Sequence, residues 1–147
     1  MISKPALKTL INRHLLDGKV LLNNRRYATA IYISGYAVEL VLKYRICRLL
    51  RFGNGYPETT GEFNAYARGR SRFTGTTIRD VRDLKIHNLR DLLFYSGEEI
   101  KFTTSLNPEW GIVQSWDVFM RYNPGIIRKG RADAFYAAAK KLVTELL

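Results

Sequence analysis

The sequence contains few of the residues on which metal, redox and secreted proteins depend. Its single cysteine, Cys47, excludes an internal disulfide and any zinc site built from cysteines. There are only two histidines, and no Gly-rich phosphate loop, metal-binding His pair or Ser/His/Asp arrangement is visible. The first residues lack the long apolar segment of a secretory signal. We therefore expect a cytoplasmic protein without a metal or another cofactor.

The sequence also lacks an apolar run of the roughly 20 residues that a membrane span requires. Its most apolar stretch lies within residues 25–51, RRYATAIYISGYAVELVLKYRICRLLR, which contain no proline. This stretch is interrupted by Glu39 and followed by Lys43 and Arg45. A helix that is apolar on nearly all sides is buried on several of them. We predict that it is the central helix of a soluble bundle.

Acidic residues are scarce relative to basic ones. The 147 residues include 24 Lys/Arg against 13 Asp/Glu, which gives a net charge of +11 and a pI near 10.0. Residues 1–51 hold most of the excess, with 10 Lys/Arg and 2 Asp/Glu. Such a surface attracts polyanions and speeds their binding. The charge therefore favours contact with nucleic acid, although a basic pI can also serve solubility alone.

Helical signals surround the central stretch. A helix is expected from about Lys4 to Leu22, with Ser3 as its N-cap and Asn23-Asn24 as the turn into the central helix. Another begins near residues 83–87 and ends at Gly97, which suits a left-handed C-cap. The last helix spans about residues 131–147. Its predicted buried residues are Ala132, Phe135, Ala139, Leu142 and Leu146.

The clearest helix start in the chain is Asn107-Pro108-Glu109, with Asn107 as N-cap. This helix is expected to continue to the turn sequence at residues 123–125. Its predicted inward residues are Trp110, Val113, Trp116 and Phe119. No strand is predicted. The chain is therefore expected to form one all-α domain, residues 1–147, an up-and-down bundle of four to five helices.

A long irregular loop is predicted between the second and third helices, at residues 52–80, because glycine and threonine are frequent there and no periodicity is sustained. Arginine can bind phosphate and aromatic rings can stack on bases. We predict RNA contacts in this segment, and the alternative is that its aromatic residues pack back on the bundle. The predicted contact residues are Arg68, Arg70, Arg72, Arg79, Tyr66 and Phe73.

Three motifs, taken in order, resemble the HEPN superfamily of small helical-bundle proteins. The first is Arg26-Tyr27-Ala28 followed by Ala37-x-Glu39-x-x-Leu42-Lys43. The second is His87-x-Leu89-x-x-Leu92, and the third is Arg121-Tyr122-Asn123-Pro124, similar to the Arg-Tyr-Pro turn of that superfamily. The resemblance implies a homodimeric helical bundle that binds RNA or nucleotide, with Arg121 and Tyr122 as candidate contacts. It also implies a role in toxin–antitoxin, defence or RNA-processing systems, with a small nucleotidyltransferase-type antitoxin as a possible partner.

The resemblance also suggests a catalytic pair. Ribonucleases of this superfamily carry an Arg-x(4–6)-His motif that acts without metal, and Arg82 and His87 have this spacing. Histidine can transfer a proton near neutral pH, and arginine can stabilise a phosphate. Here the motif lies at the start of the third helix instead of in the last core helix, so the alternative is a structural role in which His87 caps that helix or holds the preceding loop in place. His14, beside Leu10 and Ile11, is interpreted as structural.

Glu39 is the other unusual residue, because a buried carboxylate is costly unless it is paired. Lys43 follows it by four residues, the favourable order on a helix, and an arginine is an alternative partner. Glu39 is therefore either a structural ion-pair residue or a residue that orients an arginine or histidine in a site. Two functions remain open. One is a non-catalytic or weakly catalytic module that binds RNA or nucleotide, and the other is a toxin-like, metal-independent endoribonuclease in which Arg82 and His87 act across a homodimer interface.

Overall fold

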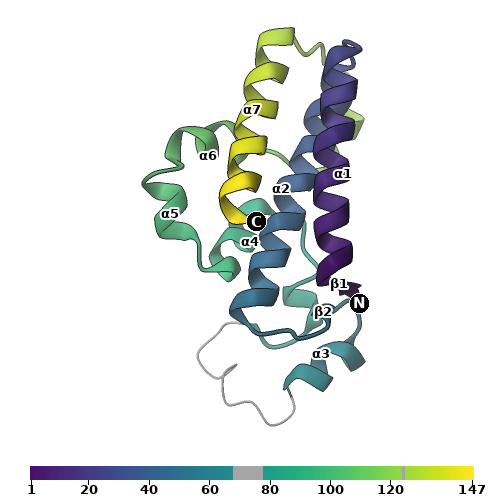
Figure 1. Ribbon diagram of the computed structural model, residues 1–147, viewed down its shortest axis with the longest axis vertical. Coiled ribbons are helices and arrows are strands. Elements are labelled where there is room, and N and C mark those ends of the chain that lie inside the picture. The colour runs from purple at the N-terminus through teal and green to yellow at the C-terminus, as the bar shows by residue number, and fades with distance from the viewer. Residues whose placement is uncertain (68–77, 124) are drawn as a thin grey trace.

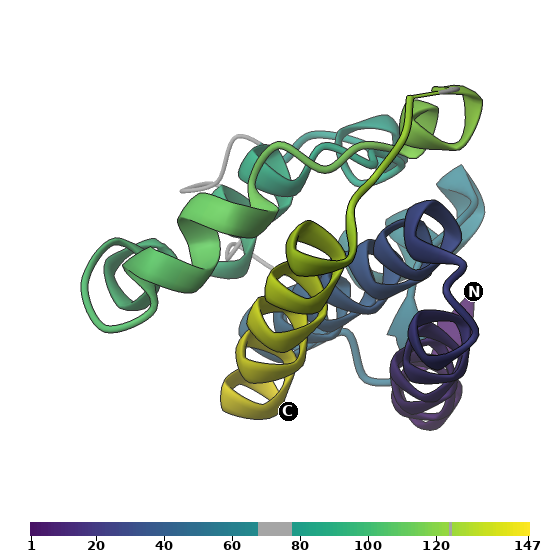
Figure 2. The same ribbon diagram turned by 90° about the horizontal axis from the view of Figure 1, so that it is seen from above.

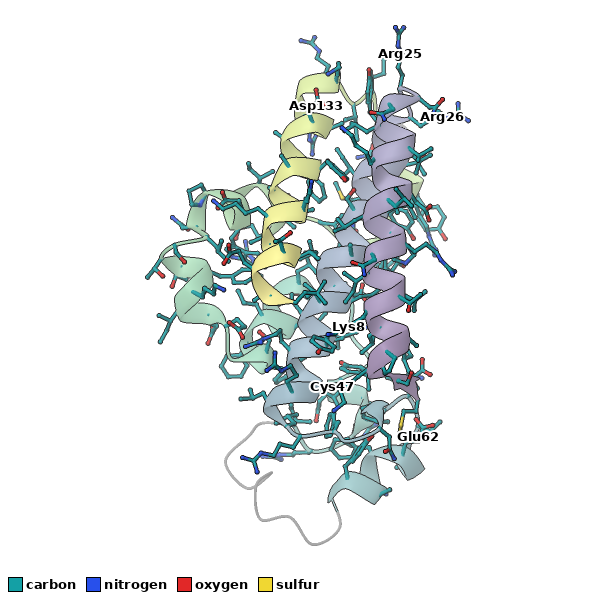
Figure 3. The ribbon with its side chains drawn as sticks, viewed as in Figure 1. Lys8, Arg25, Arg26, Cys47, Glu62 and Asp133 are labelled. Atoms are coloured by element: carbon teal, nitrogen blue, oxygen red, sulfur yellow. The ribbon has the colours of Figure 1, made fainter. Side chains whose placement is uncertain are left out.

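The computed structural model describes residues 1–67, 78–123 and 125–147. Three long helices form its centre, namely α1 (Lys4–Asn23), α2 (Tyr27–Leu49) and α7 (Lys129–Leu146) (Figure 1). The helices α1 and α2 form an antiparallel hairpin, and α7 packs against both. Figure 3 places Arg25 and Asp133 at the same end of the molecule, where α2 and α7 both begin. The predicted all-α bundle is confirmed, with α7 parallel to α2.

Local signals set the limits of the hairpin. The Ser3 hydroxyl accepts a hydrogen bond from the Ala6 N–H at 3.2 Å, which satisfies one of the free N–H groups at the start of α1. The predicted N-cap is therefore confirmed. At the other end, Arg25 adopts a left-handed backbone conformation, with φ of 60°, between α1 and α2. The turn predicted at Asn23-Asn24 thus forms one to two residues later.

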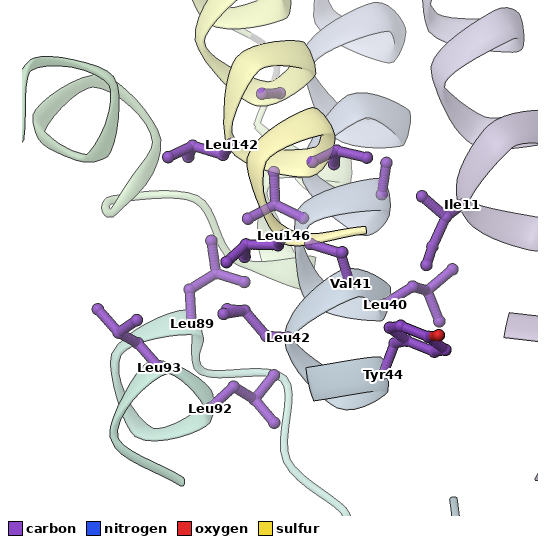
Figure 4. Packing of buried hydrophobic residues seen from close by; sticks show 14 of the residues in the cluster. Ile11, Leu40, Val41, Leu42, Tyr44, Leu89, Leu92, Leu93, Leu142 and Leu146 are labelled. Carbon is purple, nitrogen blue, oxygen red and sulfur yellow. The ribbon is translucent and has the colours of Figure 1, made fainter. Parts of the chain in front are cut away.

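Helix α2 is largely buried between Ala30 and Cys47, as its sequence predicts. Ala37, Val38, Val41 and Leu42 each have 0% of their surface exposed. The neighbouring helices cover different sides of α2, so an apolar residue at almost any position is in contact with another helix. Figure 4 shows this packing around residues 40–44, with leucines of α4 and α7 on one side and Ile11 of α1 on the other.

A second layer lies on the side of α2 away from α1 (Figure 2). It consists of α4 (Leu89–Ser96), α5 (Glu99–Thr103), α6 (Asn107–Val113) and the 3-10 helix η3 (Val118–Tyr122). Gly97 follows α4 with φ of 72°, the left-handed C-cap that was predicted. Helix α5 was not predicted.

The single helix predicted from Asn107 to the turn at 123–125 is wrong. Helix α6 ends at Val113, and its N-cap position is Leu106 instead of Asn107. Trp116 leaves the helical path, and its indole N–H donates to the Tyr32 carbonyl at 3.2 Å. Asp117 then caps η3 by accepting from the Phe119 N–H at 2.7 Å. Phe119, predicted to face inward, is 70% exposed because the chain has changed direction before it.

The segment expected to be an irregular loop contains regular structure. Strand β2 (Gly55–Tyr56) pairs antiparallel with β1 (Ile2–Ser3), and helix α3 (Thr60–Ala67) follows. The 3-10 helix η2 (Val81–Asp83) begins directly after the segment. Helix α3 begins with a capping box, in which the Thr59 hydroxyl accepts from the Glu62 N–H and the Glu62 carboxylate accepts from the Thr59 N–H. Two-residue strands are too short to show an alternating pattern in the sequence.

Candidate functional site

Glu39 forms the buried base of a polar cluster. Its side chain is 2% exposed, and its Oε1 accepts a hydrogen bond from the Lys43 Nζ at 2.6 Å. The Nδ1 of His87 lies 3.0 Å from Oε1 and 3.1 Å from Oε2. Lys43 is itself largely buried, with its ammonium 5.5 Å from the centre of the Tyr56 ring. The predicted pairing of Glu39 with Lys43 is confirmed, and the carboxylate has a histidine as its second partner.

Two capped elements hold His87 over Glu39. Before it, Asp80 and Asp83 form a capping box around η2, and the Tyr56 hydroxyl donates to the Leu84 carbonyl at 2.6 Å. After it, the Asn88 side chain accepts from the N–H groups of Arg90 and Asp91, which fixes the start of α4. His87 therefore lies one residue before the N-cap. The alternative that His87 caps the helix is wrong, because Asn88 does so.

The His87 ring is held at one nitrogen and accessible at its edge. Its side chain is 53% exposed even though Nδ1 contacts the buried carboxylate. An ionised carboxylate only accepts hydrogen bonds, so it favours a proton on Nδ1 and a lone pair on Nε2. This arrangement gives His87 a defined orientation and leaves Nε2 as the ring nitrogen that does not contact Glu39. It can exchange a proton with a bound ligand.

Aromatic rings pack behind the histidine. Tyr36 makes an edge-to-face contact with His87, with ring centres 6.5 Å apart, and another with Trp116 at 5.1 Å. The Tyr36 and Tyr32 hydroxyls are hydrogen bonded at 3.2 Å, and burial raises the pKa of Tyr36 above its usual value. Gly35 makes room for the Trp116 indole, which lies directly over it. These contacts fix the wall against which His87 rests.

A cleft of about 620 Å³ opens beside this wall, between the start of α4 and the segment that leads into η3. Residues with polar, cationic and aromatic side chains all contribute to its lining. Those that matter for ligand binding are His87, Asn88, Arg90, Gln114, Trp116 and Phe119. The Arg90 guanidinium donates to the Gln114 side-chain oxygen at 3.2 Å, which holds it at the cleft. A guanidinium, an imidazole and exposed aromatic surface can bind a phosphate and a base together.

His14, like His87, packs near the Tyr36 ring. Its ring centre is 6.1 Å from that of Tyr36, and burial lowers the pKa of His14 below its usual value. Among the described residues, its Nδ1 is buried without a hydrogen-bond partner. Its packing between α1 and α2 agrees with the structural role that was predicted for it.

Arg82 does not join the cluster. Its guanidinium donates to the Asp80 carboxylate at 2.6 and 2.9 Å, and its side chain is 88% exposed. The hydrogen bond with Asp80 raises the pKa of Arg82 and lowers that of Asp80. Within the described part of the chain, no hydrogen bond or ion pair connects Arg82 with His87 or Glu39. The structure thus brings together two of the three predicted catalytic residues.

Arg121 and Tyr122 lie on η3, adjacent to the cleft. The Arg121 guanidinium is 4.6 Å from the centre of the Tyr122 ring and donates to the Tyr32 hydroxyl at 3.5 Å. That hydrogen bond raises the pKa of Arg121. Tyr122 is 67% exposed. Both side chains are available to a ligand that extends beyond the cleft along η3.

The other predicted nucleic-acid contacts have different outcomes. Tyr66 is buried, its ring stacks on Phe52 with centres 4.6 Å apart, and its hydroxyl accepts from the N–H groups of Asn54 and Gly55. This placement corresponds to the packing alternative, because the ring is stacked on a core residue and the hydroxyl is hydrogen bonded. Arg79 is exposed beside η2, and its backbone N–H donates to Asp83. Arg68, Arg70, Arg72 and Phe73 lie outside the described residues.

Two residues of the cleft were not anticipated from the sequence as ligand contacts. Arg90 occupies the first turn of α4, and Phe119 was predicted to be buried. The spacing of Arg90 three residues after His87 was a usable signal, since both lie at the start of one helix. Phe119 gave no such signal, because its exposure depends on the interruption at Trp116.

The described residues offer little for metal or thiol chemistry. No group of three or more His, Cys, Asp or Glu side chains that could hold a metal ion is found among them. Cys47 is buried in α2, and burial raises the pKa of its thiol to about 12. A thiol that remains protonated at neutral pH is a poor nucleophile. The same residues include no helix with the length and apolarity needed to cross a bilayer.

Fold and site together define an all-α bundle in which a buried carboxylate contacts an exposed histidine at the edge of a cleft with aromatic, polar and charged lining, Arg90 and Asp117 among them. In comparisons with known proteins, no family model, curated protein or solved structure matches this chain.

Proposed function

We propose that this protein is an HEPN-like module that binds single-stranded RNA or nucleotide in the cleft beside His87. The observation that carries the proposal is the convergence of Arg90, Phe119 and the Glu39-oriented His87 on one hollow of about 620 Å³. Exposed aromatic rings stack on bases of any sequence, and arginine binds phosphate. The net charge of +11 adds long-range attraction for a polyanion.

The resemblance to the HEPN superfamily gives this proposal its setting. We place the protein in the cytoplasm, acting as a homodimer in a toxin–antitoxin, defence or RNA-processing system. A nucleotidyltransferase-type antitoxin is the partner that this setting implies. The ordered motifs around Tyr27, Glu39, His87 and Arg121 support it.

The second candidate function is a metal-independent endoribonuclease, which the contact between His87 and Glu39 favours. His87 Nε2 would accept the proton of a ribose 2′-hydroxyl while the 2′ oxygen attacks the adjacent phosphorus. The bond to the 5′ oxygen then breaks and that oxygen takes up the proton from His87 Nε2, which leaves a 2′,3′-cyclic phosphate, a 5′-hydroxyl and a regenerated histidine. Arg90, which lines the same cleft, would stabilise the charge that develops on the phosphate. Arg82 could stabilise the phosphate in the same way only if its hydrogen bonds with Asp80 were broken.

The test for binding compares two phenylalanine variants. Phe119→Leu removes a stacking surface at the cleft, and Phe94→Leu makes the same change at a half-exposed site on α4 outside the cleft lining. A stacked base contributes about 1–3 kcal/mol, so Phe119→Leu is expected to weaken binding of labelled single-stranded RNA roughly 5- to 150-fold. Phe94→Leu should leave the affinity unchanged. Fluorescence anisotropy at one fixed salt concentration measures both, and a wild type that binds neither RNA nor mononucleotides contradicts the proposal.

The catalytic alternative is tested with the same RNA in EDTA. His87→Ala, Arg90→Ala and Arg82→Ala are compared with Lys140→Gln, an exposed charge on α7. Circular dichroism first establishes that each variant is folded. Cleavage that is lost in His87→Ala and retained in Lys140→Gln supports the ribonuclease. If cleavage is also lost in Arg90→Ala but not in Arg82→Ala, Arg90 is the residue that contacts the phosphate. Binding without any cleavage by the wild type leaves the non-catalytic module.

A further inference from the structure

A second hollow lies at the end of the bundle where α1 turns into α2 and α7 begins. It has a volume of about 530 Å³ and is lined by residues from all three helices. Three of the lining side chains are cationic, namely Lys19, Arg25 and Lys129, and one is acidic, Asp133. Figure 3 shows Arg25, Arg26 and Asp133 together at this end. The cleft beside His87 lies further along α2 and does not share residues with this hollow.

The charges in the hollow are not balanced. Asp133 is engaged by Lys129, whose Nζ lies 2.5 Å from its Oδ2, and this hydrogen bond raises the pKa of Lys129. Lys19 has its ammonium 5.6 Å from the centre of the Tyr136 ring. Within the described residues, neither Lys19 nor Arg25 forms an ion pair with a carboxylate. Two cations facing one hollow without a counter-charge repel each other, and a bound anion would remove that cost.

The backbone at Arg25 adds an independent reason. Its φ of 60° is a conformation that glycine or asparagine adopts at lower cost, and strained residues of this kind often occur at binding sites. An arginine here projects a guanidinium from the tip of the hairpin, which glycine would not. Arg26 is exposed at the same end (Figure 3), and Arg128 and Arg131, which lie at the start of α7, are also exposed and extend the positive surface.

We infer that this hollow is a phosphate-binding site that holds the backbone of a single-stranded RNA whose other part occupies the cleft. The inference rests on the proposed function for its ligand. Tyr27 lines the hollow beside the cations, so the site has the basic and aromatic composition that suits a nucleotide. Glu39 lies 12 residues after Tyr27 on α2, which separates the two sites by about 18 Å along the helix axis. A mononucleotide would therefore occupy one site at a time, and a longer strand would bridge them.

The test uses a double variant, Lys19→Gln with Arg25→Asn, and a matched control, Lys8→Gln with Lys140→Gln. Asparagine tolerates the left-handed conformation at residue 25. Lys8 resembles Lys19 in that it lies on α1 with its ammonium over a tyrosine ring, that of Tyr44, but it is outside the hollow. Both double variants lower the net charge by two. Any difference in RNA binding between the two double variants therefore reflects where the charges were removed and not how many were removed.

Salt dependence gives the first readout. Each phosphate contact with a single strand contributes about 0.7 to the slope of log K against log salt. For a long single-stranded RNA, the Lys19→Gln/Arg25→Asn variant is expected to lower the magnitude of that slope by about 1.4. The control double variant should leave the slope of the wild type nearly unchanged. The affinity for a mononucleotide that fills the cleft should be unchanged in both. Equal slopes for the two double variants would overturn the inference.

Tripolyphosphate gives a second readout that does not depend on RNA. In the wild type it should shift the backbone amide resonances of residues 19–27 and 129–133, and the shifts should disappear in the Lys19→Gln/Arg25→Asn variant. Unmoved amides would overturn the phosphate site even if RNA binds at the cleft. Shifts there with no RNA binding would instead contradict the proposed function and keep the phosphate site. If polyglutamate shifts these amides and tripolyphosphate does not, the hollow accepts an acidic protein segment, and the inference fails.

Discussion

Single residues determine how closely the layers of this molecule approach, and Gly35 is the clearest case. A methyl group at this position would lie 2.1 Å from the Trp116 indole nitrogen, whose N–H holds the Tyr32 carbonyl. Trp116 has little space to retreat because it is 2% exposed. Gly35 is therefore required by the close approach of an aromatic ring and not by backbone conformation.

We predict that Gly35→Ala lowers the free energy of unfolding by about 1–3 kcal/mol, the usual cost of overpacking a core. Gly111→Ala in α6 is the control, because nothing lies within 4 Å of the added methyl group. There the change should stabilise the protein by about 0.5–1 kcal/mol, since alanine loses less backbone entropy in a helix. Guanidinium unfolding monitored by circular dichroism measures both. A Gly35→Ala protein as stable as the wild type would show that Trp116 moves freely.

At the scale of elements, the ion pair inside α2 couples that helix to the segment before α4. Glu39 is 2% exposed and Lys43 is 11% exposed at the side chain, whereas the side chain of the second partner, His87, is 53% exposed. Removing one member of a buried pair leaves the other charge without compensation. Removing an exposed partner leaves water to replace it.

We predict an order of stabilities from this difference. Glu39→Gln should cost about 3–5 kcal/mol, because Lys43 then remains buried without a carboxylate. His87→Gln should cost at most about 1 kcal/mol. The double variant Glu39→Gln/Lys43→Met should be more stable than Glu39→Gln alone, since it removes the uncompensated charge.

The pair between Lys141 and Glu109 provides the control for this series, because its lysine is exposed. The Lys141 Nζ lies 2.6 Å from the Glu109 Oε1, as in the buried pair, but the side chains of Lys141 and Glu109 are 53% and 16% exposed. Lys141→Met should change stability by at most about 1 kcal/mol. Chemical denaturation of all four variants tests the order. If Glu39→Gln were as mild as Lys141→Met, the cluster around Glu39 would be hydrated and not a buried pair.

The same elements show which features could be predicted from sequence. The N-cap at Ser3, the C-cap at Gly97 and the burial of α2 follow from local residues, and all three were predicted. The interruption after Val113 was not, because it depends on Trp116 reaching the carbonyl of Tyr32 in a distant part of the chain. The contact of Glu39 with Lys43 is local and was found. The contact with His87 spans 48 residues and could only be expected as one alternative.

For the whole molecule, the arrangement of layers implies that stability is not uniform. Helix α2 is enclosed by α1, α7 and α4, so its central amides are exposed only when those contacts separate. Helix α5 has five residues and is anchored mainly by Phe102, which packs edge-to-face on Trp110 with ring centres 5.2 Å apart. A short peripheral helix can open without disturbing the central bundle.

We therefore predict two classes of amide protection in native-state hydrogen exchange. Amides of Val38 to Ile46 should exchange only by global unfolding, and their opening free energy should fall with added guanidinium at the slope of the complete transition. Amides of α5 should exchange through local opening, at a free energy lower by a few kcal/mol and with almost no dependence on low guanidinium. Two-dimensional NMR at several denaturant concentrations separates the classes. If both helices gave the same free energy and the same slope, the peripheral layer and the central bundle would unfold as one cooperative unit, and the cleft between them would open only when the whole protein unfolds.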